Sequence, residues 1–326
     1  MFVLQLRGGL PETTHEVAAV AVRAQDGPRA APTWAVGAPI GSTWRSAAKP
    51  LQLWASLEAL GDPPDLDAED LAIGASSHSG QDLHLARVRG LLRRFDLSEA
   101  LLQCGAEPPA HLPTAQALVR QGRPFLALHN DCSGKHAFML AACRARGWST
   151  ETYLSPEHPL HRRIAQLGRD WSGEVPALAV DGCGLPTLWL PLVGMARVWA
   201  RLAGSMASPA LDPRLSAIGQ AMAAWPELTS GDGRIDLAVH RRATEPFVGK
   251  IGARGVFCVA LPARGLGVCI KVLDGDEDAL AVAIEAVLDR VAPGLLAPAE
   301  DWPWSVLRNV VGRPVGRRLA VGALGV

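Results

Sequence analysis

A serine and a lysine stand three residues apart in the segment Arg45–Gln52, and this pair of residue types can do chemistry. At the start of a predicted helix, Ser46 and Lys49 lie on the same face, within hydrogen-bonding reach. A neutral amine placed there can take the proton from the serine hydroxyl as it attacks a carbonyl carbon. The alternative is a serine that caps the helix beside a solvated lysine, because S-x-x-K occurs in many unrelated chains.

Lysine is rare in this chain. Of the 32 basic residues, 28 are arginine and four are lysine: Lys49, Lys135, Lys250 and Lys271. Arginine carries the same charge but does not lose its proton, so it cannot serve as a base or as an amine ligand of a metal. We therefore expect the few lysines of this chain to lie at sites that carry out chemistry. Lys271, in the middle of a predicted strand, has no motif around it and is interpreted as structural.

Two further segments extend the pattern. A hydroxyl-rich turn, Ser77-His-Ser79, follows an apolar run, and Lys250 in Gly249-Lys-Ile-Gly252 precedes the C-terminal strands. Serine β-lactamases and penicillin-binding proteins carry their sites in this order, although they have S-x-N and usually Thr where this chain has Ser-His-Ser and Ile251. Taken alone, the turn is better interpreted as an ordinary Ser-rich turn that caps the next helix.

Two cysteines define a candidate metal site. Cys132 and Lys135 share one segment, and Cys183 follows about fifty residues later. Cysteines flanked by Gly, Asp and His can meet on a metal such as zinc. Their spacing fits no usual C-x-x-C finger, so buried or inert thiols are the alternative.

The apolar pattern predicts the elements that must position these residues. Strands are indicated near both chain ends and helices between them, which predicts an α+β (mixed α/β) fold: an antiparallel sheet built from both chain ends with a helical lobe inserted. We expect one domain of two lobes, a sheet lobe at about 1–45 and 245–326 and a helix-rich lobe at about 46–244. The predicted strands are His15–Arg23, Thr33–Val36, Phe257–Leu261 and Gly267–Val272, and one of the predicted helices is Leu188–Met206.

The amino-acid composition limits the kinds of partner that the protein is expected to bind. The 326 residues are 48% hydrophobic with a formal net charge of zero, which argues against disorder and gives no electrostatic footprint for nucleic acid. No apolar run has transmembrane length, and the N-terminus lacks the pattern of a signal peptide. Six cysteines are too few for a disulfide scaffold. We expect a cytoplasmic protein, without membrane or nucleic-acid partners, that takes a small neutral or zwitterionic ligand.

Several motifs in order, over nearly the whole chain, make the sequence similar to the rhizobial-type, serine-dependent L-asparaginases. Such a series is far more specific than any one of its members. The motifs are Arg45-Ser-x-x-Lys-Pro-x-Gln52, Ser77-His-Ser-Gly80, Leu102-Gln-Cys-Gly105, Asn130-x-Cys-Ser-Gly-Lys-His136, Tyr153 with His158-Pro159, and Asp181-Gly-Cys-Gly-x-Pro186.

This resemblance implies a serine β-lactamase-like fold and hydrolysis of L-asparagine. It also implies two Ser–Lys pairs and one zinc ion held by three side chains and water. In this sequence these features fall on Ser46–Lys49, on Ser77–Lys250, and on Cys132, Lys135 and Cys183. Two positions depart from the family, which usually has Glu where this chain has Gln81 and often has Asn where it has Asp131.

We therefore predict an L-asparaginase in which Ser46 is the nucleophile, neutral Lys49 is the base and Ser77 with cationic Lys250 forms a second pair. Zinc with two thiolates is a poor Lewis acid, so its expected role is to shape the pocket. The candidates for binding the substrate are Arg45, Asp181 and His136. We also expect a homodimer. The alternatives are another Ser–Lys acyl hydrolase (glutaminase, esterase or β-lactamase-like) and a catalytically silent protein that binds an amino acid or zinc.

Overall fold

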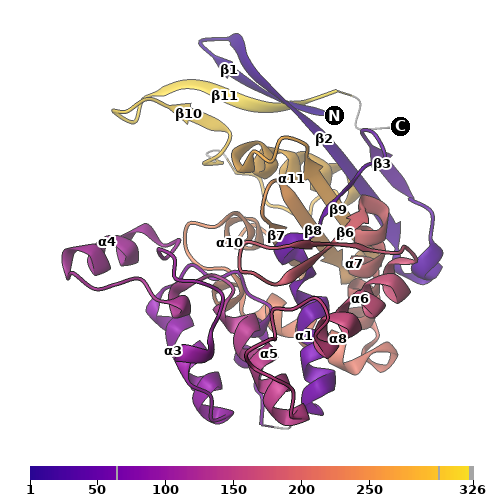
Figure 1. Cartoon of the computed structure of the whole chain (residues 1–326). Coiled ribbons are helices and arrows are strands. Elements are labelled where there is room, and N and C mark those ends of the chain that lie inside the picture. The colour runs from indigo at the N-terminus through magenta and orange to yellow at the C-terminus, as the bar shows by residue number, and fades with distance from the viewer. Residues whose placement is uncertain (64, 300–301, 323–326) are drawn as a thin grey trace.

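The computed structural model describes residues 1–63, 65–299 and 302–322, and within these ranges both ends of the chain form one eight-stranded antiparallel sheet (Figure 1). The strand order is β10-β11-β1-β2-β9-β8-β7, and β3 pairs with β2 outside this path. The strands are β1 (Phe2–Arg7), β2 (Leu10–Arg23), β3 (Trp34–Val36), β7 (Val248–Gly252), β8 (Val256–Leu261), β9 (Leu266–Val272), β10 (Val306–Arg308) and β11 (Pro314–Val321).

The centre of the sheet is buried on both faces by helices. Successive side chains of β8 alternate between two hydrophobic clusters: Cys258 belongs to the cluster that includes α7 (Leu192–Ala207), whereas Phe257 belongs to the cluster that includes α11 (Glu277–Val291). Gly267 on β9 lets α7 approach closely, since a Cβ at this position would lie 2.0 Å from the backbone nitrogen of Ala200. This buried sheet is the rigid support for Lys250 on β7.

The middle of the chain is helix-rich, as the periodicity predicts. Helix α5 (Ser133–Arg146) lies at its centre and packs against α1 (Lys49–Leu60), and its residues from Ser133 to Cys143 are buried. The other helical elements are η2 (Arg45–Ala48), α1 (Lys49–Leu60), α2 (Ala68–Gly74), α3 (Asp82–Arg94), α4 (Leu112–Arg120), α6 (Pro159–Ser172), α8 (Pro213–Ala224), α9 (Pro226–Thr229) and α10 (Ile235–His240), with short 3₁₀ turns at Ala24–Arg29, Glu99–Leu101, Ala127–His129, Pro209–Leu211 and Pro262–Arg264.

The structure confirms the α+β class, the antiparallel sheet from both chain ends and the helices inserted between them (Figure 1). The two-lobe division stays a prediction. The predicted helix Leu188–Met206 was wrong at its start, because β6 (Pro186–Pro191) precedes α7 and forms a second sheet, in the order β4-β6-β5, with β4 (Gly41–Thr43) and β5 (Ala177–Val180). A short, buried apolar run fits a strand or a helix equally well, which explains the error.

In the described part of the chain, no helix is both long enough and apolar enough to cross a membrane.

Candidate active site

The 3₁₀ turn η2 carries Ser46, and Lys49 begins the helix that follows. Ser46 is half-buried and Lys49 is fully buried. In a 3₁₀ turn, side chains three residues apart come close to eclipsing, which keeps these two on the same side. Arg45, directly before the serine, has a φ angle of +53°, which is strained for a non-glycine residue and is typical of functional sites.

The end of strand β7 approaches this turn closely. A Cβ at Gly252 would lie 2.6 Å from the Trp44 carbonyl oxygen and 3.3 Å from the Ala47 backbone nitrogen. Glycine therefore permits a backbone approach that other residues would block. The Ala47 N–H lies directly after Ser46 at the start of a helical segment, so it is placed to donate to an oxygen held near the serine.

The amine of Lys49 joins the first serine motif to the second. Lys49 Nζ lies 2.8 Å from Ser77 Oγ, donates to the Ser76 carbonyl, and lies 3.4 Å from the Asp131 carbonyl oxygen. Carbonyl oxygens only accept, whereas a hydroxyl also donates. A neutral amine here can give its two N–H groups to the carbonyls, which leaves its lone pair to accept a proton from a serine hydroxyl.

Lys250 is buried on β7, with its Nζ 3.0 Å from the Ile251 carbonyl oxygen and 3.5 Å from the Asp236 carboxylate. Burial lowers its pKa to about 8, and Lys49 adds to this effect while Asp236 opposes it. In the described residues, the hydrogen bond of Ser77 to a lysine goes to Lys49 rather than to Lys250. A direct Ser77–Lys250 pair therefore stays a prediction.

The structure brings Cys132, Lys135 and Cys183 together in a buried cluster. The interaction between the two thiols lowers the pKa of Cys183 and, together with burial, raises that of Cys132. Lys135 Nζ is buried and has no hydrogen-bond partner in the described residues, and the same holds for Nε2 of the adjacent His136. Burial opposes the charge of Lys135, but the two sulfurs and Asp181 raise its pKa.

This donor set fits a zinc ion. Two thiols and an orphaned amine form a compact group of sulfur and nitrogen donors, and a thiolate is the ligand that zinc prefers. The described residues contain no group of three or more His, Cys, Asp or Glu side chains that can hold a metal. A metal at the thiol cluster would therefore need the nitrogen of Lys135 as a third protein ligand.

The three candidate substrate residues lie around the thiol cluster. Arg45 Nε donates to Asp181 Oδ1 over 2.6 Å, so the strained residue before Ser46 is tied to the loop that carries Cys183. His136 is fully buried, and its Nδ1 lies 2.8 Å from the Tyr153 hydroxyl. Burial lowers the pKa of His136, which favours the neutral imidazole.

Sequence reasoning missed two charged residues of the site, Arg234 and Asp236. Arg234 donates to the Asp131 carboxylate over 2.6 Å, and Asp236 faces Lys250. Burial opposes the charge of Asp131, but Lys49 and Arg234 hold its pKa well below its usual range. Arg234 is one of 28 arginines, so rarity did not mark it.

The other family departure, Gln81, lies at the N-terminus of α3. Its Nε2 donates to the Asp232 carboxylate over 3.1 Å, and its Oε1 accepts from the Asp232 backbone nitrogen over 3.0 Å. Gln81 therefore connects the segment after Ser77 to the segment before Arg234. A glutamate could not donate to Asp232, so the amide is what this contact requires.

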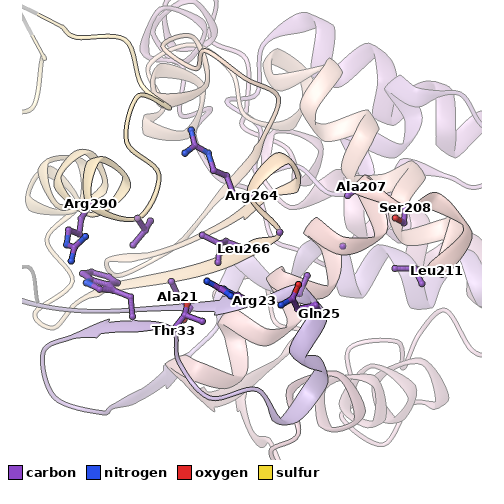
Figure 2. A pocket seen from close by; sticks show the side chains of 15 residues that line it. Ala21, Arg23, Gln25, Thr33, Ala207, Ser208, Leu211, Arg264, Leu266 and Arg290 are labelled. Carbon is purple, nitrogen blue, oxygen red and sulfur yellow. The ribbon is translucent and has the colours of Figure 1, made fainter. Parts of the chain in front are cut away.

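A separate cavity of about 810 Å³ lies between the C-terminal ends of α7 and α11 and the start of β9 (Figure 2). Three arginines, Arg23, Arg264 and Arg290, line it together with apolar and small side chains. None of the site residues named above belongs to its lining in the described ranges. The serine, lysine and thiol groups therefore form a site of their own.

Comparison with known proteins gives one family match. The family model for L-asparaginase II matches residues 3–319. A search of curated proteins found no match.

Solved structures give weaker likenesses. A β-lactamase from Mycobacterium bovis is 16% identical, with 84% of this chain and 94% of that chain covered and a TM-score of 0.44. A structure of Mglu is 15% identical (89% and 70% covered, TM-score 0.46), and unliganded simvastatin synthase LovD from Aspergillus terreus is 14% identical (81% and 90% covered, TM-score 0.34). At these TM-scores the likenesses carry no argument.

Proposed function

Because the chain belongs to the L-asparaginase II family, as the match over residues 3–319 shows, we propose that it hydrolyses the side-chain amide of L-asparagine to L-aspartate and ammonia. The observation that carries this proposal is the buried Lys49 amine, which bonds to Ser77 and stands three residues after Ser46. Two hydroxyls and one amine are the groups that an acyl-transfer reaction needs.

In the proposed reaction, Ser46 Oγ attacks the amide carbon and Lys49 takes the serine proton. Lys49 then passes this proton through Ser77, to which it is bonded, to the amide nitrogen, which leaves as ammonia and returns Lys49 to its neutral form. The Ala47 N–H stabilises the negative oxygen of the tetrahedral intermediate, and one such donor is typically worth about 3 kcal/mol. The C–N bond breaks, an aspartyl ester forms on Ser46, and water hydrolyses the ester with Lys49 again as the base.

Cys132, Lys135 and Cys183 are the residues that would hold zinc, and a zinc ion bound there would supply a fixed positive charge that shapes the pocket rather than an activated water. The chain's own groups do the chemistry in this proposal. Asp181, oriented by Arg45, is proposed to bind the substrate ammonium group with its remaining carboxylate oxygen. His136 is fully buried, and its unpartnered Nε2 is proposed to contact the substrate.

Coupled ammonia detection on a panel of small amides tests the proposed function. Release from L-asparagine well above that from L-glutamine supports it, whereas release from L-glutamine alone would identify a glutaminase. Cleavage of esters or β-lactams without amide turnover would identify another acyl hydrolase. A protein that binds the amino acid and turns over none of these substrates would be a sensor. The homodimer and the cytoplasmic location stay predictions, and light scattering in solution tests the first.

Activity is expected to fall at alkaline pH. In the proposed mechanism Lys250 acts as a cation, and its pKa of about 8 means that it is charged below this pH and neutral above it. Each pH unit well above 8 should therefore reduce kcat/KM about tenfold, as for loss of one essential proton. The check is the pH profile of kcat/KM for ammonia release. A rate that stays high well above pH 8 would contradict a cationic role for Lys250.

The purified protein is expected to contain about one zinc per chain, because the thiol cluster offers three donors. Replacing Cys132 or Cys183 by serine should remove the metal, since a neutral hydroxyl is a far poorer ligand than a thiolate. Elemental analysis of each variant is the measurement, and Cys143→Ser is the control for a buried thiol outside the cluster.

If zinc only shapes the pocket, the zinc-free protein should show a raised KM with a smaller change in kcat. A collapse of kcat alone after chelation would contradict this role. A protein purified without zinc and with ordinary KM would make the two cysteines structural thiols.

A further inference from the structure

Asp236 is a buried carboxylate on α10 that no motif marks. It is 4% exposed, and both of its oxygens are engaged. Oδ1 accepts from the Ser230 hydroxyl over 2.8 Å, and Oδ2 lies 3.5 Å from Lys250 Nζ and 3.4 Å from the Ile251 backbone nitrogen. A buried carboxylate is unfavourable unless it is paired and hydrogen-bonded, so these partners account for its presence.

The partners of Asp236 lie on strand β7, which carries Lys250, and at Ser230, which is bonded to the segment that carries Ser77. The backbone nitrogen of Ser77 donates to the Thr229 carbonyl over 3.0 Å, and the backbone nitrogen of Ser79 donates to the Ser230 carbonyl over 2.8 Å. Ser230 is thus bonded to the Ser77 segment through its backbone and to Asp236 through its hydroxyl. One carboxylate therefore connects the second serine motif to strand β7.

We propose that Asp236 is the positioning residue that holds Lys250 at the active site as its buried counter-ion. Lysine is a point charge on a flexible four-carbon stem, so its direction has to be set by partners. The Ile251 carbonyl, on the neighbouring residue of the same strand, accepts the hydrogen bond that the Lys250 amine makes within the described residues, and Asp236 is its ion-pair partner. Asp236 lies on a different element, helix α10, and its carboxylate therefore sets the direction of the Lys250 amine. The positioning of Lys250 by Asp236 does not depend on the proposed function, whereas its effect on catalysis rests on it.

Asp236 also sets the electrostatic balance at Lys250. The charged groups that act on this amine are Asp236 and Asp131, which favour its protonated form, and Lys49 and Arg234, which disfavour it. The Asp236 carboxylate, 3.5 Å away, is the anion for which the structure gives a direct ion pair. Without it, Arg234 disfavours the protonated amine, as does Lys49 when that lysine carries a proton, and the Asp131 charge opposes them.

The test is Asp236→Asn, which keeps the shape and removes the charge. Since the chain has four lysines, ¹³Cε-lysine labelling gives four signals, and Lys250→Arg identifies the one that belongs to Lys250. An opposite charge at this distance typically shifts a pKa by about one to three units, so the Lys250 midpoint should fall by about one unit or more in Asp236→Asn. Asp232→Asn, an exposed carboxylate in the same segment, is the matched control and should leave the midpoint in place.

An unchanged Lys250 midpoint in folded Asp236→Asn would overturn the proposal. If that variant does not fold, Ser230→Ala decides, because it removes one hydrogen bond from Asp236 and leaves both charges. A changed Lys250 chemical shift or midpoint in Ser230→Ala supports the positioning role, and signals identical to the wild type overturn it. The NMR readout needs no turnover, so it stands even if no amide is hydrolysed. Where the wild type does release ammonia, the alkaline limb of its pH profile should move down with the midpoint in Asp236→Asn.

Discussion

Replacing Ser46 by alanine is expected to abolish ammonia release from L-asparagine while leaving the protein folded. The serine is proposed to form the covalent ester, and removing even one acid–base contact typically lowers a rate by about 10²-fold or more. Stability should change little, because Ser46 is half-buried and its hydroxyl has no hydrogen bond in the described residues. The measurements are kcat for ammonia release, the melting temperature, and mass spectrometry of the protein mixed with substrate.

Ser42→Ala is the matched control for this prediction. Ser42 is also a half-buried serine on the same stretch of chain, and within the described ranges its hydroxyl bonds only to the neighbouring Thr43 carbonyl. It should keep full activity. Ser77→Ala provides a second comparison, because Lys49 bonds to Ser77 directly. If Ser46→Ala keeps more than about a hundredth of wild-type kcat and Ser77→Ala does not, then Ser77 is the nucleophile.

The rarity of lysine directed attention to Lys49, Lys135 and Lys250, and their roles stay predictions. All three are buried, but so is Lys271, so burial alone does not separate a lysine kept for chemistry from a structural one. Lys271, interpreted as structural, donates to the backbone carbonyls of Arg254 and Leu273 near the end of β9. Composition could single out these residues because arginine replaces lysine wherever only a charge is needed.

The order of elements along the chain predicted the α+β architecture but not which side chains meet. The hydrogen bond from Lys49 to Ser77, rather than to Ser46, depends on how η2 and the end of α2 are packed, which local periodicity does not report. Asp236 was missed for a related reason. It lies on a six-residue helix, and its function as a partner of Lys250 appears only when β7 is placed beside that helix.

Replacing Lys49 by arginine is expected to be nearly as damaging as replacing it by alanine, with kcat lowered about 10²-fold or more in both. The proposed role needs an amine that loses its proton, and a guanidinium remains charged at any pH a protein tolerates. If Lys49 contributed only charge, arginine would restore most of the activity. Ammonia release at saturating L-asparagine, measured for both variants, decides between these roles.

Two further variants separate chemistry from packing at this buried position. Lys49→Met removes the amine but keeps the length of the side chain, and it should be inactive while its melting temperature stays the same or rises, because burying an amine is costly. Lys271→Arg is the control for placing a guanidinium at a buried lysine that bonds to backbone carbonyls, and it should keep activity.

If Lys49→Arg is active, Lys49 contributes only its charge, and the base must be sought at Lys250, whose pKa of about 8 lets it lose a proton near neutral pH. Activity that rises through pH 8 in the wild type would then be the matching observation, since a base works only after it has lost its proton.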